Sequence, residues 1–102
     1  MTPAIEEKRE AVAGLCHRFD VERLHVFGSA ASDRFDTAAS DLDFLVEFRR
    51  SDTMTLADQY FGLLSALEEL FDREVDLVTA GSLRNPYFVR SIEATRRLLY
   101  AA

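Results

Sequence analysis

The chain has 102 residues, of which 48 % are apolar, and its formal net charge is −6. This length fits one compact domain spanning residues 1–102 and excludes a large multidomain enzyme. The acidic balance argues against tight, sequence-independent binding of DNA or RNA, which needs clustered Lys and Arg. We therefore expect no direct nucleic-acid partner.

The sequence also bears on cellular location. No apolar run approaches the roughly 20 residues of a membrane span, so no membrane association is expected. The N-terminal residues lack the basic start and apolar stretch of a signal peptide. The single cysteine, Cys16, cannot form an internal disulfide, which suits a reducing compartment. A cytoplasmic protein is predicted.

The first part of the chain predicts a helix, a strand and a loop. Apolar residues recur at helical spacing after Thr2-Pro3, a capping residue followed by proline, which predicts a helix over residues 3–18. Residues 23–27 alternate in part and stop at Gly28, as expected of a strand. Residues 29–40 are small and polar and predict a loop with one short helical turn after Ser29.

The second half predicts two helices around a strand. Thr55 and Asp58 form a capping-box pattern that starts a helix over residues 55–71. Residues 74–78 predict a strand, and Asn85-Pro86 starts a last helix over residues 86–99. The inner stripe of this helix is expected to consist of Phe88, Ile92, Thr95 and Leu99. Together with an acidic strand over residues 41–48, the order predicts an α+β fold, in which helices pack on one face of a small mixed sheet.

That acidic strand is the most informative element. Positions 42, 44, 46 and 48 are apolar, whereas positions 41, 43 and 47 are acidic. Because strand side chains alternate between faces, one face belongs to the core and the other carries carboxylates. Aspartate is a poor strand former, so Asp41 and Asp43 call for an explanation.

A third carboxylate extends the pattern. If the strand of Asp76 lies beside the acidic strand, Asp76 joins Asp41 and Asp43 on the same face. Three unpaired carboxylates repel one another, and a hard divalent cation such as Mg²⁺ removes that repulsion. The alternative is a solvent-facing sheet surface that carries acids for solubility, and the spacing alone does not decide between the two.

Gly28-Ser29 favours a phosphate-binding site over simple solubility. Glycine lets a backbone approach a phosphate closely, and a small hydroxyl side chain can donate to it. The pair alone is a weak signal, since most Gly-Ser pairs are turns. A strand ending in Gly-Ser, followed by a loop and a strand opening Asp-x-Asp, would place phosphate donors beside a metal site.

These residues carry a family resemblance. Phe27-Gly28-Ser29, followed after eleven residues by Asp41-Leu42-Asp43-Phe44-Leu45-Val46, resembles the signature of the polymerase-beta-type nucleotidyltransferase superfamily. Glu74-Val75-Asp76-Leu77-Val78 is similar to the strand that carries the third carboxylate of that family. The small size and the residues from Leu83 onward resemble the minimal nucleotidyltransferase (MNT) antitoxins that accompany HEPN-domain toxins.

The resemblance implies a reaction and a set of site residues. Such proteins transfer AMP from ATP to a tyrosine hydroxyl of the partner toxin and thereby silence its RNase activity. Carried over to this chain, Gly28 and Ser29 would hold the triphosphate. Asp41 and Asp43 would bind Mg²⁺, and Asp76 would help bind the metal and accept the proton of the attacking hydroxyl.

The chain departs from the family pattern in one informative place. Relatives commonly have Arg-Gly a few residues after Gly-Ser, where this chain has Ser32-Asp33, with Arg34 nearby. The departure favours an alternative in which the protein neutralises its toxin by binding, without catalysis. A small-molecule nucleotidyltransferase is a third alternative, although such relatives usually carry an extra helical domain. The sequence leaves open whether the chain forms homo-oligomers or hetero-oligomers with a toxin.

Overall fold

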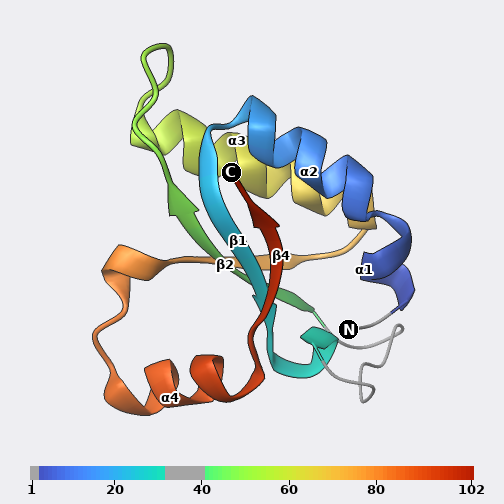
Figure 1. The fold of residues 1–102 in the computed structure, drawn as a ribbon, viewed down its shortest axis with the longest axis vertical. Helices are drawn as coiled ribbons and strands as arrows, with labels where there is room; N and C mark the ends of the chain where they lie inside the picture. Colours follow the sequence, from blue (N-terminus) through green and yellow to red (C-terminus); the bar gives the residue numbers. More distant parts are fainter. Residues whose placement is uncertain (1–2, 32–40) are drawn as a thin grey trace.

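The computed structural model describes residues 3–31 and 41–102, which form a four-stranded sheet with helices (Figure 1). Thr2 and the predicted loop residues 32–40, including Ser32, Asp33 and Arg34, lie outside the described residues. The elements in chain order are α1 (Pro3–Glu7), α2 (Arg9–Arg18), β1 (Val21–Phe27), the 3₁₀ turn η1 (Gly28–Ala31), β2 (Leu42–Phe48), α3 (Leu56–Phe71), β3 (Val75–Thr79), the 3₁₀ turn η2 (Ala80–Ser82), α4 (Pro86–Thr95) and β4 (Arg97–Ala101).

The sheet is mixed, as predicted. Its strand order is β3-β2-β1-β4, with β2 parallel to β3 and both β2 and β4 antiparallel to β1. The connection from β2 to β3 runs through α3, the crossover that neighbouring parallel strands require. This crossover places β3 beside β2 although sixteen residues of helix separate them.

One face of the sheet carries the main core. The side chains of Leu24, Phe44 and Val46 point from the strands toward Val12 of α2 and Leu63 of α3, and all five are fully buried. Cys16 belongs to the same cluster, and burial raises the pKa of its thiol to about 12. Amphipathic helices therefore cover this face, with α2 and α3 in contact with each other.

The last helix occupies the other face. Ile92 of α4 forms a second buried cluster with Phe27 and Leu45, whose neighbours Val26 and Phe44 point into the main core. The prediction that the helices pack on one face is correct for α2 and α3, whereas α4 lies apart from them (Figure 1). Phe27 and Leu45 are apolar residues on the outer side of their strands, and α4 shields them from water.

The capping signals begin their helices as predicted. Thr55 accepts a hydrogen bond from the Asp58 backbone N–H, and the Asp58 side chain accepts one from the Thr55 N–H, which completes a capping box. The Asn85 side chain accepts from the Tyr87 N–H, with Pro86 in the first turn of α4. The predicted helix over residues 3–18 is instead two helices that break at Lys8, whose ammonium group donates to the Leu70 carbonyl.

The predicted last helix over residues 86–99 is wrong beyond Thr95. Arg96 has an extended backbone, and Arg97–Ala101 form strand β4 against β1. Helical spacing had placed Leu99 on an inner stripe, and the strand buries the same side chain in the main core. Pairing β1 on its second side satisfies backbone groups that a helix would have left to water, so tertiary structure overrides local periodicity here.

In the described part of the chain, no helix is both long enough and apolar enough to cross a membrane.

A close approach between α3 and Phe19 gives a test of the packing. A Cβ atom added at Gly62 would lie 2.4 Å from Phe19 Cε1, whereas one added at Gly14 would meet nothing within 4 Å. We expect Gly62→Ala to lower the free energy of unfolding by about 1–3 kcal/mol through overpacking. Gly14→Ala, also within a helix, should raise it by about 0.5–1 kcal/mol. Urea titrations give both values, and equal stability of the two variants would contradict this packing.

Candidate active site

Asp43 and Asp76 lie side by side on the outer face of the sheet. The parallel register pairs Asp43 of β2 with Asp76 of β3, and pairs Phe44 with Leu77 one residue later. Phe44 and Leu77 are buried in the main core, so the two aspartates point to the opposite face. Asp41 precedes β2 and is exposed. Hydrophobic pairing on one face thus fixes the position of two carboxylates on the other.

The carboxylates interact electrostatically. Burial, followed by the negative charges of Asp76 and Asp41, raises the pKa of Asp43 from 3.8 to about 6. Within residues 3–31 and 41–102, no three His, Cys, Asp or Glu side chains are grouped closely enough to hold a metal ion. The charges of Asp76 and Asp41 therefore act on Asp43, but the three aspartates do not form a closed cage.

The donor set suits a hard divalent cation. Asp41, Asp43 and Asp76 supply only oxygen ligands, which Mg²⁺ prefers, and a cation would relieve the repulsion that raises the Asp43 pKa. Glu47, the other acid that the alternation placed on this face, forms a salt bridge with Arg23 across β1 and β2. Its charge is thereby partly balanced by a neighbour, whereas no salt bridge joins Asp41, Asp43 or Asp76 to another residue of the described ranges 3–31 and 41–102.

The backbone at the end of β1 comes close to Asp43. Gly28 opens η1 with a φ of +70°, a left-handed conformation that favours glycine. A Cβ atom at this position would lie 2.8 Å from Asp43 Oδ2, too close for a side chain. The conformation therefore favours glycine, and a larger residue would also displace the Asp43 carboxylate. Ser29 follows within η1, so the backbone of the predicted phosphate-binding pair adjoins the carboxylates.

One neighbour of Gly28 was not identified from the sequence as part of the site. The Gly28 N–H donates to Thr95 Oγ1 over 2.9 Å, although 67 positions separate the two residues. The sequence placed Thr95 on the inner stripe of the last helix, with nothing to indicate this contact. The sequence offered one signal for this contact, a β-branched residue with a hydroxyl group near the end of a helix.

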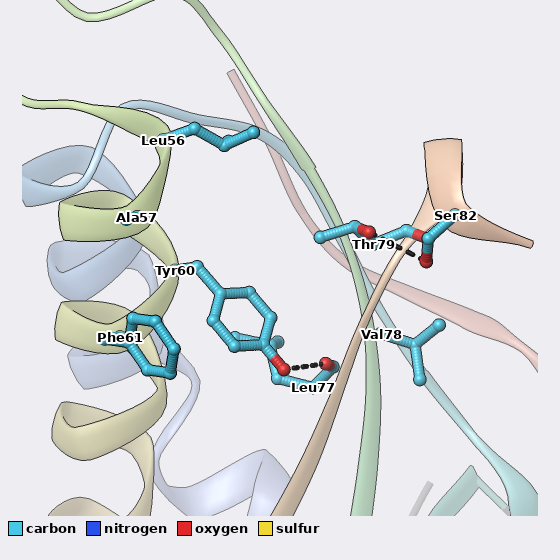
Figure 2. A pocket seen from close by; sticks show the side chains of 8 residues that line it. All are labelled: Leu56, Ala57, Tyr60, Phe61, Leu77, Val78, Thr79 and Ser82. Atoms are coloured by element: carbon cyan, nitrogen blue, oxygen red, sulfur yellow. Dashed lines mark hydrogen bonds between the residues drawn. The ribbon is translucent and has the colours of Figure 1, made fainter.

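Two cavities beside β3 are separate from this site. Their volumes are about 530 and 550 Å³, and among the described residues their linings include none of Asp41, Asp43, Asp76 or Gly28. Figure 2 shows the first, in which the Tyr60 hydroxyl donates to the Leu77 carbonyl over 2.6 Å. The described lining of the first cavity carries no charged side chain, and that of the second includes Glu47 and Arg84 but none of the predicted site residues. The candidate active site is therefore the carboxylate face.

Comparison with known proteins identifies the family. The family profile of the nucleotidyltransferase domain matches residues 8–99. The chain belongs to this nucleotidyltransferase family. The resemblance inferred from Gly28-Ser29, Asp41, Asp43 and the strand of Asp76 is thereby confirmed at the level of the family, and the protein is a nucleotidyltransferase by that membership.

Two relatives come from Methanocaldococcus jannaschii, and each is named a "putative protein adenylyltransferase". One is 37 % identical over 79 residues, covering 78 % of this chain and 76 % of the relative. The other is 36 % identical over 76 residues, covering 74 % of both.

Solved structures agree on the fold. One, described as a "putative minimal nucleotidyltransferase", is 35 % identical with a TM-score of 0.70, covering 90 % of this chain and 89 % of that one. An MNT antitoxin solved in complex with a tri-AMPylated HEPN toxin of Shewanella oneidensis has a TM-score of 0.65 at 18 % identity. That match covers 96 % of this chain and 73 % of the antitoxin. At this identity the likeness concerns the fold alone.

The glycine at position 28 can be tested by substitution. We expect Gly28→Ala to lower the free energy of unfolding by about 1–2 kcal/mol, because alanine is strained at positive φ and its Cβ meets Asp43 Oδ2. Gly81→Ala is the matched control, since a Cβ there meets nothing within 4 Å. Urea titration measures both variants. A Gly28→Ala protein as stable as the control would contradict the close approach to Asp43.

The raised pKa of Asp43 predicts an unusual pH dependence. The folded pKa is about 6 and the ordinary value 3.8, so protonation contributes stability that is fully present below pH 3.8 and lost as pH rises through 6. Asp43→Asn should therefore raise the Tm at pH 8 and change it little at pH 3.5. Because the carboxylate is partly exposed and screened, we expect a gain of about 2–5 °C.

Thermal melts in EDTA from pH 3.5 to pH 8 provide the measurement. Asp52→Asn, an exposed acid in the turn after β2, serves as the control and should not reproduce the gain. Adding Mg²⁺ at pH 8 should stabilise the unsubstituted protein more than Asp43→Asn. A loss of Tm in Asp43→Asn at pH 8 in EDTA would argue against repulsion among the aspartates.

Proposed function

We propose that this nucleotidyltransferase transfers AMP from ATP to a tyrosine hydroxyl of a partner HEPN toxin. The observation that carries the proposal is the in-register pair Asp43–Asp76 with the Gly28 backbone directly against Asp43. Carboxylates beside a glycine turn suit a metal-dependent reaction of a nucleoside triphosphate. The names of the two archaeal relatives support protein adenylylation, and the fold of the toxin-bound MNT antitoxin supports the choice of partner.

The chain's own residues have distinct roles in this proposal. Asp41, Asp43 and Asp76 would hold Mg²⁺, and Gly28 and Ser29 would hold the triphosphate through the backbone of η1. Bound Mg²⁺ would neutralise the triphosphate and make its α-phosphorus more electrophilic. Little other chemistry is required of so small a protein, because phosphoryl-type transfer depends mainly on positioning and charge neutralisation.

The reaction balances with one proton acceptor. The tyrosine oxygen forms a new bond to the α-phosphorus, while the bond from that phosphorus to the bridging oxygen breaks and pyrophosphate leaves. The phenolic proton passes to Asp76, which is exposed on the edge strand and therefore accessible to a protein acceptor. Asp43, half-buried between β1 and β3, is less accessible and serves as a ligand.

Incubation with the partner tests the proposal. The protein is mixed with ATP, Mg²⁺ and the product of the neighbouring gene, which the proposal expects to be a HEPN-type toxin, and intact mass should show AMP added to that product. Asp41→Asn combined with Asp43→Asn should abolish transfer while leaving the circular dichroism of the folded protein unchanged. Asp52→Asn, outside the carboxylate face, should retain transfer.

The same double variant separates catalysis from simple binding. Expressed with the toxin, it should fail to protect cells, because transfer and not occupancy silences the toxin. Full protection by the double variant would overturn the proposal that catalysis silences the toxin. It would favour an antitoxin that acts by binding, the alternative that Ser32-Asp33 raised.

A further inference from the structure

The hydroxyl of Thr95 connects the end of α4 to the first residue of η1. It accepts from the Gly28 N–H over 2.9 Å and donates to the Ser91 carbonyl over 3.1 Å. Because both bonds use the same oxygen, the bond to Ser91 fixes the hydroxyl proton away from Gly28 and leaves a lone pair facing the Gly28 N–H. The hydroxyl is thus oriented as an acceptor.

The sheet register explains why a side chain is needed at this point. The antiparallel ladder between β1 and β4 pairs His25 with Leu98 and Val26 with Arg97. The same register, continued by two residues, would bring Gly28 opposite Thr95. Thr95 is the last residue of α4 and not part of a strand, so its side-chain oxygen takes the place of a ladder acceptor.

A threonine that bonds the carbonyl four residues earlier is common in helices and would by itself carry no meaning. The second bond, to Gly28, distinguishes Thr95 from that ordinary case. Two further contacts tie α4 to the same end of β1. The ring of Phe88 packs edge-on against Phe27 with centroids 6.1 Å apart, and Ile92 is buried against Phe27.

These contacts bear directly on the site. Gly28 lies between Thr95, which holds its N–H, and Asp43, whose carboxylate oxygen would be 2.8 Å from an added Cβ. A displacement of Gly28 would therefore change the spacing between the start of η1 and the carboxylates. Because Thr95 already engages the Gly28 N–H, Gly28 would serve the triphosphate by letting the turn approach it closely, and the backbone N–H donors to the phosphates would come from Ser29 onward.

We propose that Thr95 is a positioning residue, which holds Gly28 against Asp43 and so sets the distance between the nucleotide-binding turn and the metal-binding carboxylates. This inference rests on the proposed roles of Gly28 and Asp43. It does not depend on which acceptor receives the nucleotide.

Two substitutions at Thr95 test the role. Thr95→Val keeps the branched shape and removes the hydroxyl, whereas Thr95→Ser keeps the hydroxyl and removes a methyl group. Thr79→Val is the control, because the Thr79 hydroxyl bonds to Ser82 away from Gly28. Binding of mant-ATP in Mg²⁺ is followed by fluorescence, and exchange of the Gly28 amide proton is followed by NMR.

The expected result depends on whether residue 95 keeps its hydroxyl group. Thr95→Val should weaken mant-ATP binding and speed Gly28 exchange by about tenfold each, since a lost bond to a partly buried N–H is worth roughly that factor. Thr95→Ser keeps the hydroxyl that holds Gly28, and Thr79→Val removes a hydroxyl that lies away from Gly28. Both variants should therefore stay within about twofold of the unsubstituted protein in mant-ATP affinity and in Gly28 exchange rate.

Failure of this inference differs from failure of the proposed function. Nucleotide binding by Thr95→Val equal to that of the unsubstituted protein, or an equal loss in Thr95→Ser, would overturn the positioning role. An unsubstituted protein that binds mant-ATP but modifies no HEPN-type protein would overturn the proposed function, and the Thr95 variants would still decide the positioning role. An unsubstituted protein that binds no Mg²⁺-nucleotide would overturn both.

Discussion

The in-register pairing of Asp43 with Asp76 is the constraint on which the site depends. Two carboxylates on neighbouring strands repel each other, and like charges placed opposite in a sheet are destabilising. The opposite face offsets this repulsion, because the same register pairs Phe44 with Leu77 in the core. A slip of one residue in either strand would move the aspartate of that strand into the core, so the hydrophobic pattern that stabilises the fold also maintains the unfavourable charge pair.

The edge strand that carries Asp76 is held by its own chain. A free sheet edge presents backbone groups that can pair with another strand. Here alternate residues of β3 are bonded by side chains of neighbouring elements: the Val75 N–H donates to Glu68, the Leu77 carbonyl accepts from Tyr60, and the Thr79 carbonyl accepts from Ser82. These bonds protect the edge without covering the outer face, so Asp76 remains exposed while its strand stays fixed.

Much of the fold followed from local signals, because those signals act within a few residues. The capping box of Thr55 and Asp58 begins α3, and apolar residues at every second position from Leu42 to Phe48 define β2. The position of α4 and the existence of β4 did not follow, since both depend on distant partners. Leu99 fits an inner position in a helix and in a strand alike, and only the unfilled side of β1 decides between them.

The same distinction applies to the site. Asp43 and Asp76 stand out as candidates because aspartate opposes strand formation, and Asp41 stands out by its period-two spacing from Asp43. Gly28 could be found because a strand must end there. Thr95 supports its helix and opposes nothing, so its contact with Gly28 left no trace in local propensity. Residues that perform chemistry can conflict with local structure and become visible in a sequence, whereas residues that position them satisfy local structure and require coordinates.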